Sequence, residues 1–180
     1  MARLTTVTRP ELPGLPCPYC GLVTAADAEG AVSAAASWGW CGVKLTIEHQ
    51  PAGLLLLRPL EDPTQARVVS LWVAPEHTGV GYGRQLVQAA AAGLIERRVR
   101  SVYARSGRGR VTCGTPPREF LRAVGFSRGL DERLWRLDLD RTVGERAGLL
   151  EAFERLMGSL RPAPPEPAGG AISGAARARH

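Results

Sequence analysis

Several features that assign a chain to a broad class are missing from this sequence. No run of eighteen apolar residues occurs, so no membrane-spanning helix is expected, and residues 1–16 lack the apolar stretch of a signal peptide. The net charge of +6 comes from scattered arginines, because Lys44 is the only lysine, and no block of five basic residues occurs. Aromatic residues are also few, so the pattern of a nucleic-acid-binding surface is absent. We therefore expect a cytoplasmic protein with neither a membrane nor a nucleic-acid partner.

The chain is long enough for one folded domain, and its pattern changes near both ends. Residues 1–24 contain several prolines, which block regular pairing, so we expect an irregular N-terminal segment. Residues 25–140 alternate helical and strand patterns, which is typical of an α/β fold with helices on both faces of a sheet. Residues 141–161 carry an apolar stripe that predicts an amphipathic helix, either packed on the domain or used as a homodimer contact. Residues 162–180 are rich in Pro, Ala and Gly, so we expect a disordered tail.

Regular elements can be assigned within residues 25–140 from hydrophobic periodicity and turn residues. Gly39 is expected to end the first helix, and residues 49–52 are expected to form the turn between two strands. The continuous apolar run at 54–57 predicts a strand that is buried on both faces. The expected order is a helix at 27–36, strands at 42–48, 53–58 and 68–73, a helix at 83–98, a strand at 99–104, a helix at 117–124, and a strand pair within 127–139.

Residues 68–86 are the most informative stretch, because a buried strand is followed by a glycine-spaced loop and an amphipathic helix. Glycines at 79, 81 and 83 allow the backbone to approach a ligand closely, since no Cβ stands in the way. The helix that follows directs free N–H groups and its positive dipole end toward the loop, which favours an anion such as phosphate. The pattern therefore predicts a site for a small molecule that carries a pyrophosphate.

Two common phosphate-binding loops fit this stretch poorly. A P-loop needs Lys followed by Ser or Thr after its last glycine, and Arg84 followed by Gln85 stands there instead. The glycine spacing does not match the dinucleotide fingerprint, and Tyr103 stands where that fingerprint expects an acidic residue. Neither of these nucleotide-binding classes is therefore supported.

The segment 73–83 resembles motif A of the GNAT acyltransferase superfamily, which reads roughly Val-x-Pro-Glu-x-Arg-Gly-x-Gly-x-Gly, and it departs from that motif at Thr78. Residues 118–126 resemble the family's motif B, a short helix that ends in Gly-Phe, here Gly125 and Phe126. Gly125 also suits the left-handed residue that follows a helix. The two motifs occur in the family's order, and the resemblance covers about residues 40–140.

The resemblance implies a central mixed β-sheet flanked by helices, with acetyl-coenzyme A as the acyl donor. It also implies that the loop grips the pyrophosphate, while backbone groups of the preceding strand pair with the pantetheine arm and the thioester carbonyl. Such a backbone donor would stabilise the oxyanion of the tetrahedral intermediate. The implied coenzyme A-binding residues are Trp72, Val73, Ala74, Thr78, Gly79, Val80, Gly81, Tyr82, Gly83 and Arg84.

The residues that would move protons are less evident from the sequence. Many family members carry a carboxylate on the strand before motif A, but residues 67–74 contain none. Leu121 stands at the usual position of the motif B tyrosine and cannot act as an acid. The candidates for the catalytic base and acid are Glu48 and Tyr103, and the other polar candidates, at predicted turns, are His49, Asp131 and Glu132.

The four cysteines form one C-x-x-C pair, Cys17 and Cys20, and two isolated residues. A structural zinc site usually takes two such pairs. The pair also resembles the C-P-Y-C of glutaredoxin-like redox sites, but such a site needs a strand before the pair and a helix that begins at the first cysteine, and the prolines beside Cys17 do not suit this. We therefore expect free thiols and no bound metal. If a metal were bound, Cys41 would be the third ligand, because it follows the pair within one short helix.

Two functions fit these observations. The leading hypothesis is an N-acetyltransferase that transfers the acetyl group of acetyl-coenzyme A to a small-molecule or peptide amine. The alternative is a non-catalytic acyl-coenzyme A-binding module, or a cysteine-based regulatory module, on the same fold. Leu121 and the carboxylate-free strand favour the alternative, and the glycine loop fits both.

Overall fold

One sheet organises the fold, and one of its inner strands contains the leucine run at 54–57. The computed structural model describes residues 1–22, 28–107, 115–129 and 131–140. The strands are β1 (Ala2–Val7), β2 (Gly42–Ile47), β3 (Gln50–Pro59), β4 (Gln65–Val73), β5 (Ser101–Arg105), β6 (Ser127–Arg128) and β7 (Leu134–Asp138). The helices are α1 (Glu29–Trp38), α2 (Tyr82–Ile95) and α3 (Arg118–Ala123), with the 3-10 turns η1 (Arg9–Gly14) and η2 (Pro75–His77).

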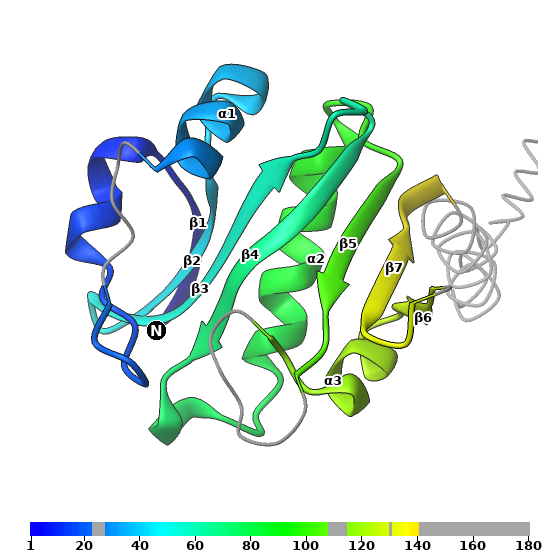
Figure 1. Cartoon of the computed structure of the whole chain (residues 1–180). Coiled ribbons are helices and arrows are strands. Elements are labelled where there is room, and N and C mark those ends of the chain that lie inside the picture. Colours follow the sequence, from blue (N-terminus) through cyan, green and yellow to red (C-terminus); the bar gives the residue numbers. More distant parts are fainter. Residues whose placement is uncertain (23–27, 108–114, 130, 141–180) are drawn as a thin grey trace, which may run out of the picture. The chain divides into compact units, whose positions relative to one another are not determined.

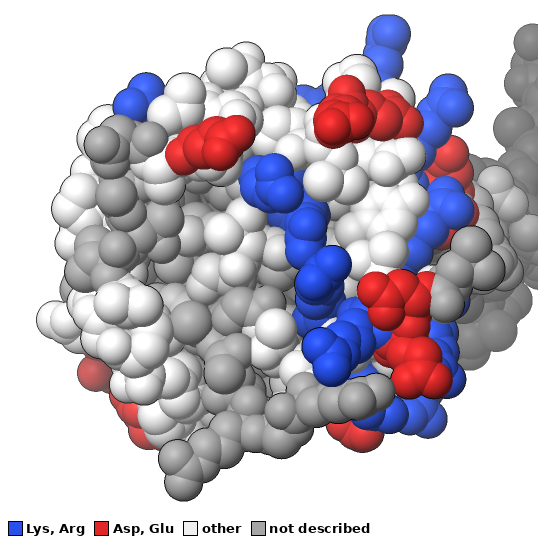
Figure 2. Space-filling model, in the orientation of Figure 1, with Lys and Arg blue, Asp and Glu red and all other residues white. Residues whose placement is uncertain are grey.

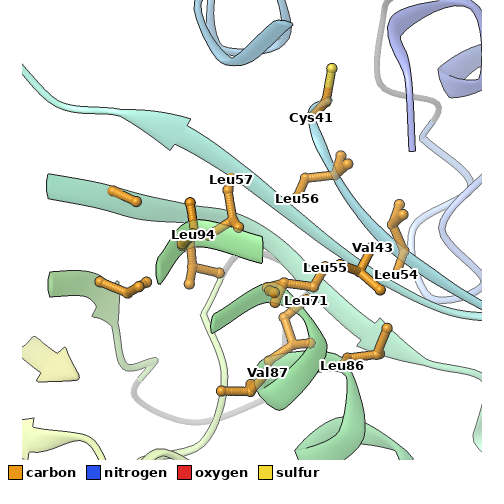
Figure 3. Close-up of a cluster of buried hydrophobic side chains, with 14 of the residues drawn as sticks. Cys41, Val43, Leu54, Leu55, Leu56, Leu57, Leu71, Leu86, Val87 and Leu94 are labelled. Carbon is orange, nitrogen blue, oxygen red and sulfur yellow. The ribbon is translucent and has the colours of Figure 1, made fainter. Parts of the chain in front are cut away.

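In the described part of the chain the strands lie in the order β1-β2-β3-β4-β5-β7-β6, and β4 and β5 are the only parallel neighbours (Figure 1). α1 and α2 cover opposite faces of this mixed sheet. Leu55 and Leu57 of β3 lie on the same side as Val87 and Leu94 of α2, whereas Leu56 points to the other side, where α1 packs (Figure 3). Each leucine buried in this way contributes about 2 kcal/mol. The predicted mixed sheet with flanking helices is therefore confirmed.

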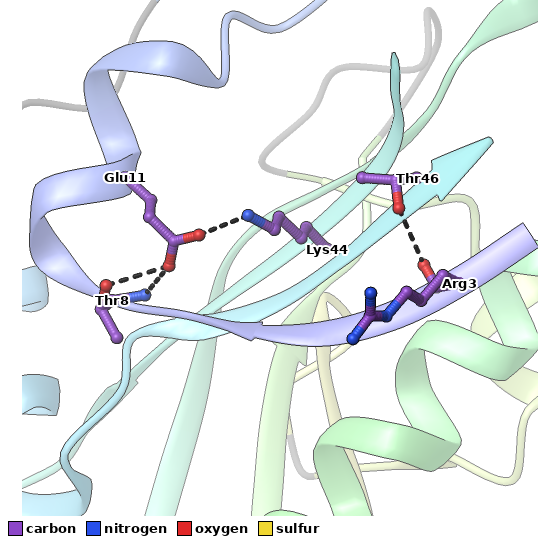
Figure 4. A network of polar contacts seen from close by, with 5 residues as sticks. All are labelled: Arg3, Thr8, Glu11, Lys44 and Thr46. Atoms are coloured by element: carbon purple, nitrogen blue, oxygen red, sulfur yellow. Dashed lines mark hydrogen bonds and ion pairs between the residues drawn. The ribbon is translucent and has the colours of Figure 1, made fainter. Parts of the chain in front are cut away.

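The N-terminal segment differs from the sequence analysis, which expected irregular structure over residues 1–24. β1 pairs with β2 as an antiparallel edge strand, and η1 follows it directly. The prolines do not prevent this pairing, because the first of them lies in η1, beyond the end of the strand. Glu11 of η1 forms an ion pair with Lys44 of β2 and accepts hydrogen bonds from the Thr8 backbone N–H (2.8 Å) and hydroxyl (2.9 Å) (Figure 4). These contacts fix η1 to the sheet.

The turn between β2 and β3 also lies earlier than predicted. It consists of Glu48 and His49, whose φ angles are 50° and 68°, while residues 50–52 already belong to β3. Two central residues with positive φ are typical of the tight turns that match the twist of a β-hairpin. Neither residue is the Gly or Asn that usually marks such a turn, which is why the sequence pattern placed it later.

β4 and β5 pair over a short stretch and then diverge. Residues 65–67 lie beside residues 101–103, and Arg67 with Tyr103 is the last pair of this parallel register. Beyond Arg67, β4 keeps its partner β3 as far as Val73, but the described residues provide no strand on its other edge (Figure 1). This open edge leaves backbone N–H and C=O groups without strand partners in the middle of the sheet.

None of the helices within the described residues is long and apolar enough to cross a membrane. The predicted amphipathic helix at 141–161, the tail at 162–180, Asp27 and Cys113 lie outside the described residues. The predictions made for them, and the division of the chain at residues 24, 140 and 161, stay predictions.

Candidate functional site

A cavity of about 520 Å³ lies where the open edge of β4 meets the start of α2 and one side of α3. Its walls come from four separate parts of the chain: the N-terminal segment, the end of β4, the glycine loop, and α3 with the residues before it. The lining residues are Tyr19, Leu71, Trp72, Val73, His77, Thr78, Gly79, Gly81, Tyr82, Gly83, Arg84, Pro116, Pro117, Phe120, Ala123 and Val124.

The glycine loop exposes its backbone at two positions. Gly79 and Gly81 have left-handed conformations with φ angles of 80° and 92°, and no atom lies within 4 Å of the Cβ that a side chain would add there. α2 begins at Tyr82, directly after the loop, and its first turn holds no acidic residue. The first N–H groups of a helix have no partner within the helix, so this end of α2 is suited to bind an anion.

Gly83 has a different role from the other two glycines. A Cβ at Gly83 would lie 2.8 Å from the ring of Phe120, so glycine is needed for α2 and α3 to approach this closely. The Arg84 guanidinium donates a hydrogen bond of 3.0 Å to the carbonyl of Ala123, the last residue of α3. These two contacts hold α3 against the start of α2 and form one wall of the cavity.

Hydrogen bonds determine which backbone groups of β4 face the cavity. The Ala74 N–H donates to the Ala52 carbonyl of β3 over 2.9 Å, so it points away from the open edge. Because the backbone groups of successive strand residues alternate in direction, Val73 points its N–H and C=O toward the open edge. The Val73 carbonyl accepts a hydrogen bond of 2.7 Å from the Tyr19 hydroxyl, which agrees with this direction. Of the expected contributors Trp72, Val73 and Ala74, Val73 therefore has the backbone groups that a ligand can reach.

Tyr19 is a cavity residue that the sequence analysis missed. It lies 54 residues before the carbonyl that it binds, so no local spacing could have revealed the contact. Burial, with smaller contributions from Cys17 and Glu76, raises the pKa of Tyr19, so the phenol keeps its proton and acts as a donor at neutral pH. His77 was also missed, although it lines the cavity with its ring edge-on to Tyr82, at a centroid distance of 6.2 Å.

The structure brings together most of the residues that the resemblance implied. Thr78, Gly79, Gly81, Tyr82, Gly83 and Arg84 line the cavity together with Trp72 and Val73, whereas Ala74 does not. The side chain of Val80 is outside the lining and is 65% exposed to solvent. Glu48 lies on the turn between β2 and β3, and Tyr103 lies in β5; neither lines the cavity. Among the described residues, no carboxylate lines the cavity.

Comparison with known proteins identifies the family. Residues 21–126 match the model of the acetyltransferase (GNAT) family. The chain belongs to the GNAT family. Its fold is similar to that of PaiA N-acetyltransferase from Thermoplasma acidophilum, solved with coenzyme A, at a TM-score of 0.57 and 12% identity, covering 77% of this chain and 99% of that one.

Two further GNAT-fold structures are similar. The ribosomal-protein-S18-alanine N-acetyltransferase from Escherichia coli has a TM-score of 0.51 and 14% identity, covering 77% of this chain and 94% of that one. A GNAT-family acetyltransferase from Staphylococcus aureus Mu50 has a TM-score of 0.54 and 14% identity, covering 77% of this chain and 99% of that one. At these identities the likeness shows the fold. The sequence has no significant match among curated proteins.

The motif B helix of this GNAT chain supplies an apolar wall and no acid. Leu121, at the place of the family's usual tyrosine, is 1% exposed and lies in the core, outside the cavity lining. Phe120 instead points its ring toward Gly83. Gly125 follows the helix with a φ angle of 98°, the left-handed conformation that the sequence predicted for it.

The three cysteines in the described part of the chain do not assemble around one point. Cys17 and Cys41 are buried, whereas Cys20 is exposed. The Cys41 thiol donates to the Ala31 carbonyl of α1 over 3.4 Å, and burial raises its pKa. No group of three metal-ligating side chains occurs in the described ranges, so Cys41 does not join Cys17 and Cys20 as the third ligand that the sequence analysis named. The reason is that Cys41 packs under α1 at the start of β2.

Proposed function

We propose that this GNAT chain is an N-acetyltransferase that transfers the acetyl group of acetyl-coenzyme A to an amine of a small molecule or peptide. The observation that carries the proposal is that one cavity joins the anion-binding loop to the open edge of β4. The complex of PaiA with coenzyme A, on the same fold, supports the choice of donor.

The donor would bind mainly through the backbone. Its pyrophosphate would lie at residues 78–84, against the free N–H groups at the start of α2. Val80 fits this scheme only through its backbone, since its side chain lies outside the cavity lining. Ala74 does not fit it, because its side chain is also outside the lining and its N–H is bonded to Ala52 of β3. The pantetheine arm would then run along the open edge of β4 and pair with the N–H and C=O of Val73.

Transfer requires the amine nitrogen to attack the thioester carbonyl carbon. A tetrahedral intermediate forms, the carbon–sulfur bond breaks, and coenzyme A leaves as its thiol while the amine loses one proton. A β4 N–H directed at the carbonyl oxygen would stabilise the oxyanion by ~3 kcal/mol. Glu48 and Tyr103 remain our candidates for base and acid. Because neither lines the cavity, we expect the loss of either to slow turnover less than disruption of the loop.

A non-catalytic acyl-coenzyme A-binding module is the second candidate. It is favoured by the lack of a carboxylate in the cavity lining of the described residues and by the burial of Leu121. The two candidates bind the same donor and differ only in turnover. Release of free thiol from acetyl-coenzyme A in the presence of primary amines therefore separates them.

A matched pair of variants tests the loop itself. Gly81→Asp places a negative charge beside the expected pyrophosphate, whereas Gly81→Asn has nearly the same shape, no charge, and a similar tolerance of the left-handed backbone. We expect the Kd for acetyl-coenzyme A, measured by calorimetry, to be about tenfold higher for Asp than for Asn, because the carboxylate repels the pyrophosphate. Equal Kd values would contradict the loop assignment. Binding without thiol release would support the binding module.

A further inference from the structure

Three arginines lie together on the sheet face opposite α2; we call them the arginine trio. Arg58 of β3 and Arg67 of β4 are direct cross-strand partners. Arg105 lies in β5, two residues beyond Tyr103, which is the partner of Arg67. Side chains alternate along a strand, and Val68 packs against α2 on the other face, so the trio shares one face.

No carboxylate in the described part of the chain forms an ion pair with the trio. Arg136, the next arginine across the sheet, differs, because Asp138 lies 3.5 Å from it. Burial, followed by the charges of Arg105 and Arg58, lowers the pKa of Arg67, which agrees with the placement of Arg67 between the other two arginines. Glu29 lines a neighbouring hollow together with Arg58 but forms no ion pair with it.

This arrangement is unfavourable for the fold alone. Like charges that are partly withdrawn from water and lack a counter-charge destabilise the folded state. Arg58 and Arg67 are both partly buried. Figure 2 shows a band of basic side chains down the middle of this face, with acidic side chains beside the band. A ligand that supplies the missing negative charge would remove the repulsion.

The trio lies at the closed end of the gap between β4 and β5. Arg67 belongs to the last parallel pair, and the glycine loop lies at the other end of the open stretch at 68–73. Six strand residues span ~20 Å, so a donor arm that enters at the loop and follows β4 carries its acyl end toward Arg67. The acceptor amine must meet the acyl carbon there, with the rest of the acceptor beside the trio.

We propose that Arg58, Arg67 and Arg105 bind an anionic group of the acceptor, so that the substrate is an amine that also carries a carboxylate or a phosphate. Guanidinium groups bind both anions through paired N–H donors. The inference rests on the proposed function, because it assigns the acceptor of the same reaction. It also orients the acceptor, since the anion binds at the trio while the amine faces the thioester.

Thiol release with three small primary amines tests the proposal: phosphoethanolamine, β-alanine and uncharged ethanolamine. We expect kcat/KM to be about tenfold higher for at least one anionic amine than for ethanolamine, the effect of one charge-assisted hydrogen bond. Arg67→Gln and Arg105→Gln should each remove most of this preference, through a higher KM for the anionic amine. Arg3→Gln, on the distant edge strand β1, is the matched control and should keep the preference. The better of the two anionic amines identifies the anion.

A measurement that needs no turnover completes the test. Phosphoethanolamine or β-alanine should raise the Tm of the wild-type coenzyme A complex but not that of Arg67→Gln or Arg105→Gln. At low salt and without ligand, Arg67→Gln should unfold at the same temperature as wild type or higher, whereas a structural role for Arg67 would lower its Tm.

The outcomes are distinguishable. Equal rates for all three amines, or a preference that survives in both arginine variants, would overturn the anionic acceptor and leave the acetyltransferase intact. If coenzyme A binds but no amine is acetylated, the Tm shift decides: a shift confined to wild type and Arg3→Gln supports the anion site, and no shift overturns it. Failure to bind coenzyme A and to release thiol would overturn the proposed function and this inference with it.

Discussion

At the scale of single residues, the contact between Tyr19 and Val73 governs the open edge of β4. The Tyr19 hydroxyl donates a hydrogen bond to the Val73 carbonyl oxygen. The tyrosine side chain also lines the cavity, and the residue is 46% exposed to solvent. In the proposed complex that carbonyl would accept an amide N–H of the pantetheine arm. The phenol and the donor arm would therefore compete for one acceptor atom.

Tyr19→Phe should strengthen donor binding. The variant keeps the ring that lines the cavity but frees the Val73 carbonyl, so we expect the Kd for acetyl-coenzyme A to fall by about two- to tenfold, the range of one neutral hydrogen bond. Calorimetry measures the change, with Tyr103→Phe, outside the cavity lining, as the control that leaves Kd unchanged. A Kd that rises tenfold in Tyr19→Phe would show instead that the hydroxyl binds the donor directly.

Also at the scale of single residues, Glu11 makes the free energy of unfolding depend on pH. Its hydrogen bond with Lys44, and then those from Thr8, lower the pKa of Glu11 below its ordinary value. The stabilisation is therefore present at pH above the unfolded value of about 4.3 and is lost as pH falls through the lower folded value. We expect Glu11→Gln to reduce the free energy of unfolding by about 0.5 kcal/mol at pH 7, the scale of a solvent-screened pair.

Urea unfolding at a series of pH values measures this effect. The difference between wild type and Glu11→Gln should shrink as pH drops below 4 and vanish once Glu11 is protonated in both states. Glu61→Gln, at an exposed position, is the control and should show no such dependence. A difference that persists unchanged in acid would mean that Glu11 acts through packing rather than charge.

At the scale of elements, close contact between β2 and β3 sets the geometry of the strand that supports β4. A Cβ at Gly42 would lie 2.1 Å from the Leu55 carbonyl oxygen of β3, which no small adjustment relieves. Gly42 is the first residue of β2, and its backbone also pairs with Val7 of β1. One glycine thus allows three strands to meet under α1.

Gly42→Ala should therefore destabilise the whole sheet. We expect a loss of about 2–3 kcal/mol in the free energy of unfolding, because overpacked strands must move apart. Gly14→Ala is the control, since nothing lies within 4 Å of a Cβ at that position; it should be neutral or slightly stabilising. Chemical denaturation of both variants checks this, and equal stabilities would mean that β2 shifts at little cost.

At the scale of the whole molecule, the cavity is assembled from segments far apart in sequence, so its ligand should couple to global stability. Residues from the N-terminal segment, β4, α2 and α3 all line it. A donor that binds only when these segments are in place binds the folded state alone. Ligand binding of this kind raises the free energy of unfolding with ligand concentration.

Acetyl-coenzyme A at a hundred times its Kd should add about 2.7 kcal/mol and raise Tm by roughly 5–10 °C. Acetylpantetheine, which lacks the pyrophosphate, should give a much smaller rise at the same concentration, because it cannot use the anion site at the start of α2. Thermal unfolding followed by circular dichroism measures both. Equal Tm shifts for the two compounds would show that the glycine loop does not bind the pyrophosphate of the donor.

Local sequence determined the parts of this protein that depend on neighbouring residues. The glycine spacing located the turn at Gly79 and Gly81, the apolar period located α2, and Gly125 marked the end of α3. In each case the backbone conformation is set within a few residues, by φ preferences, hydrophobic periodicity or helix ends. The family motifs lie in these same local segments.

Only the tertiary structure decided which strands pair, in which register, and which distant residues come into contact. The pairing of β1 with β2 overrode the proline signal, and the fold carried Tyr19 to a carbonyl 54 residues away. The register between β3 and β4 placed Arg58 opposite Arg67, and the pairing of Ala74 with β3 left Val73 as the group that faces the cavity. Strand neighbours and register follow from packing of the whole core, and no short window of sequence contains that information.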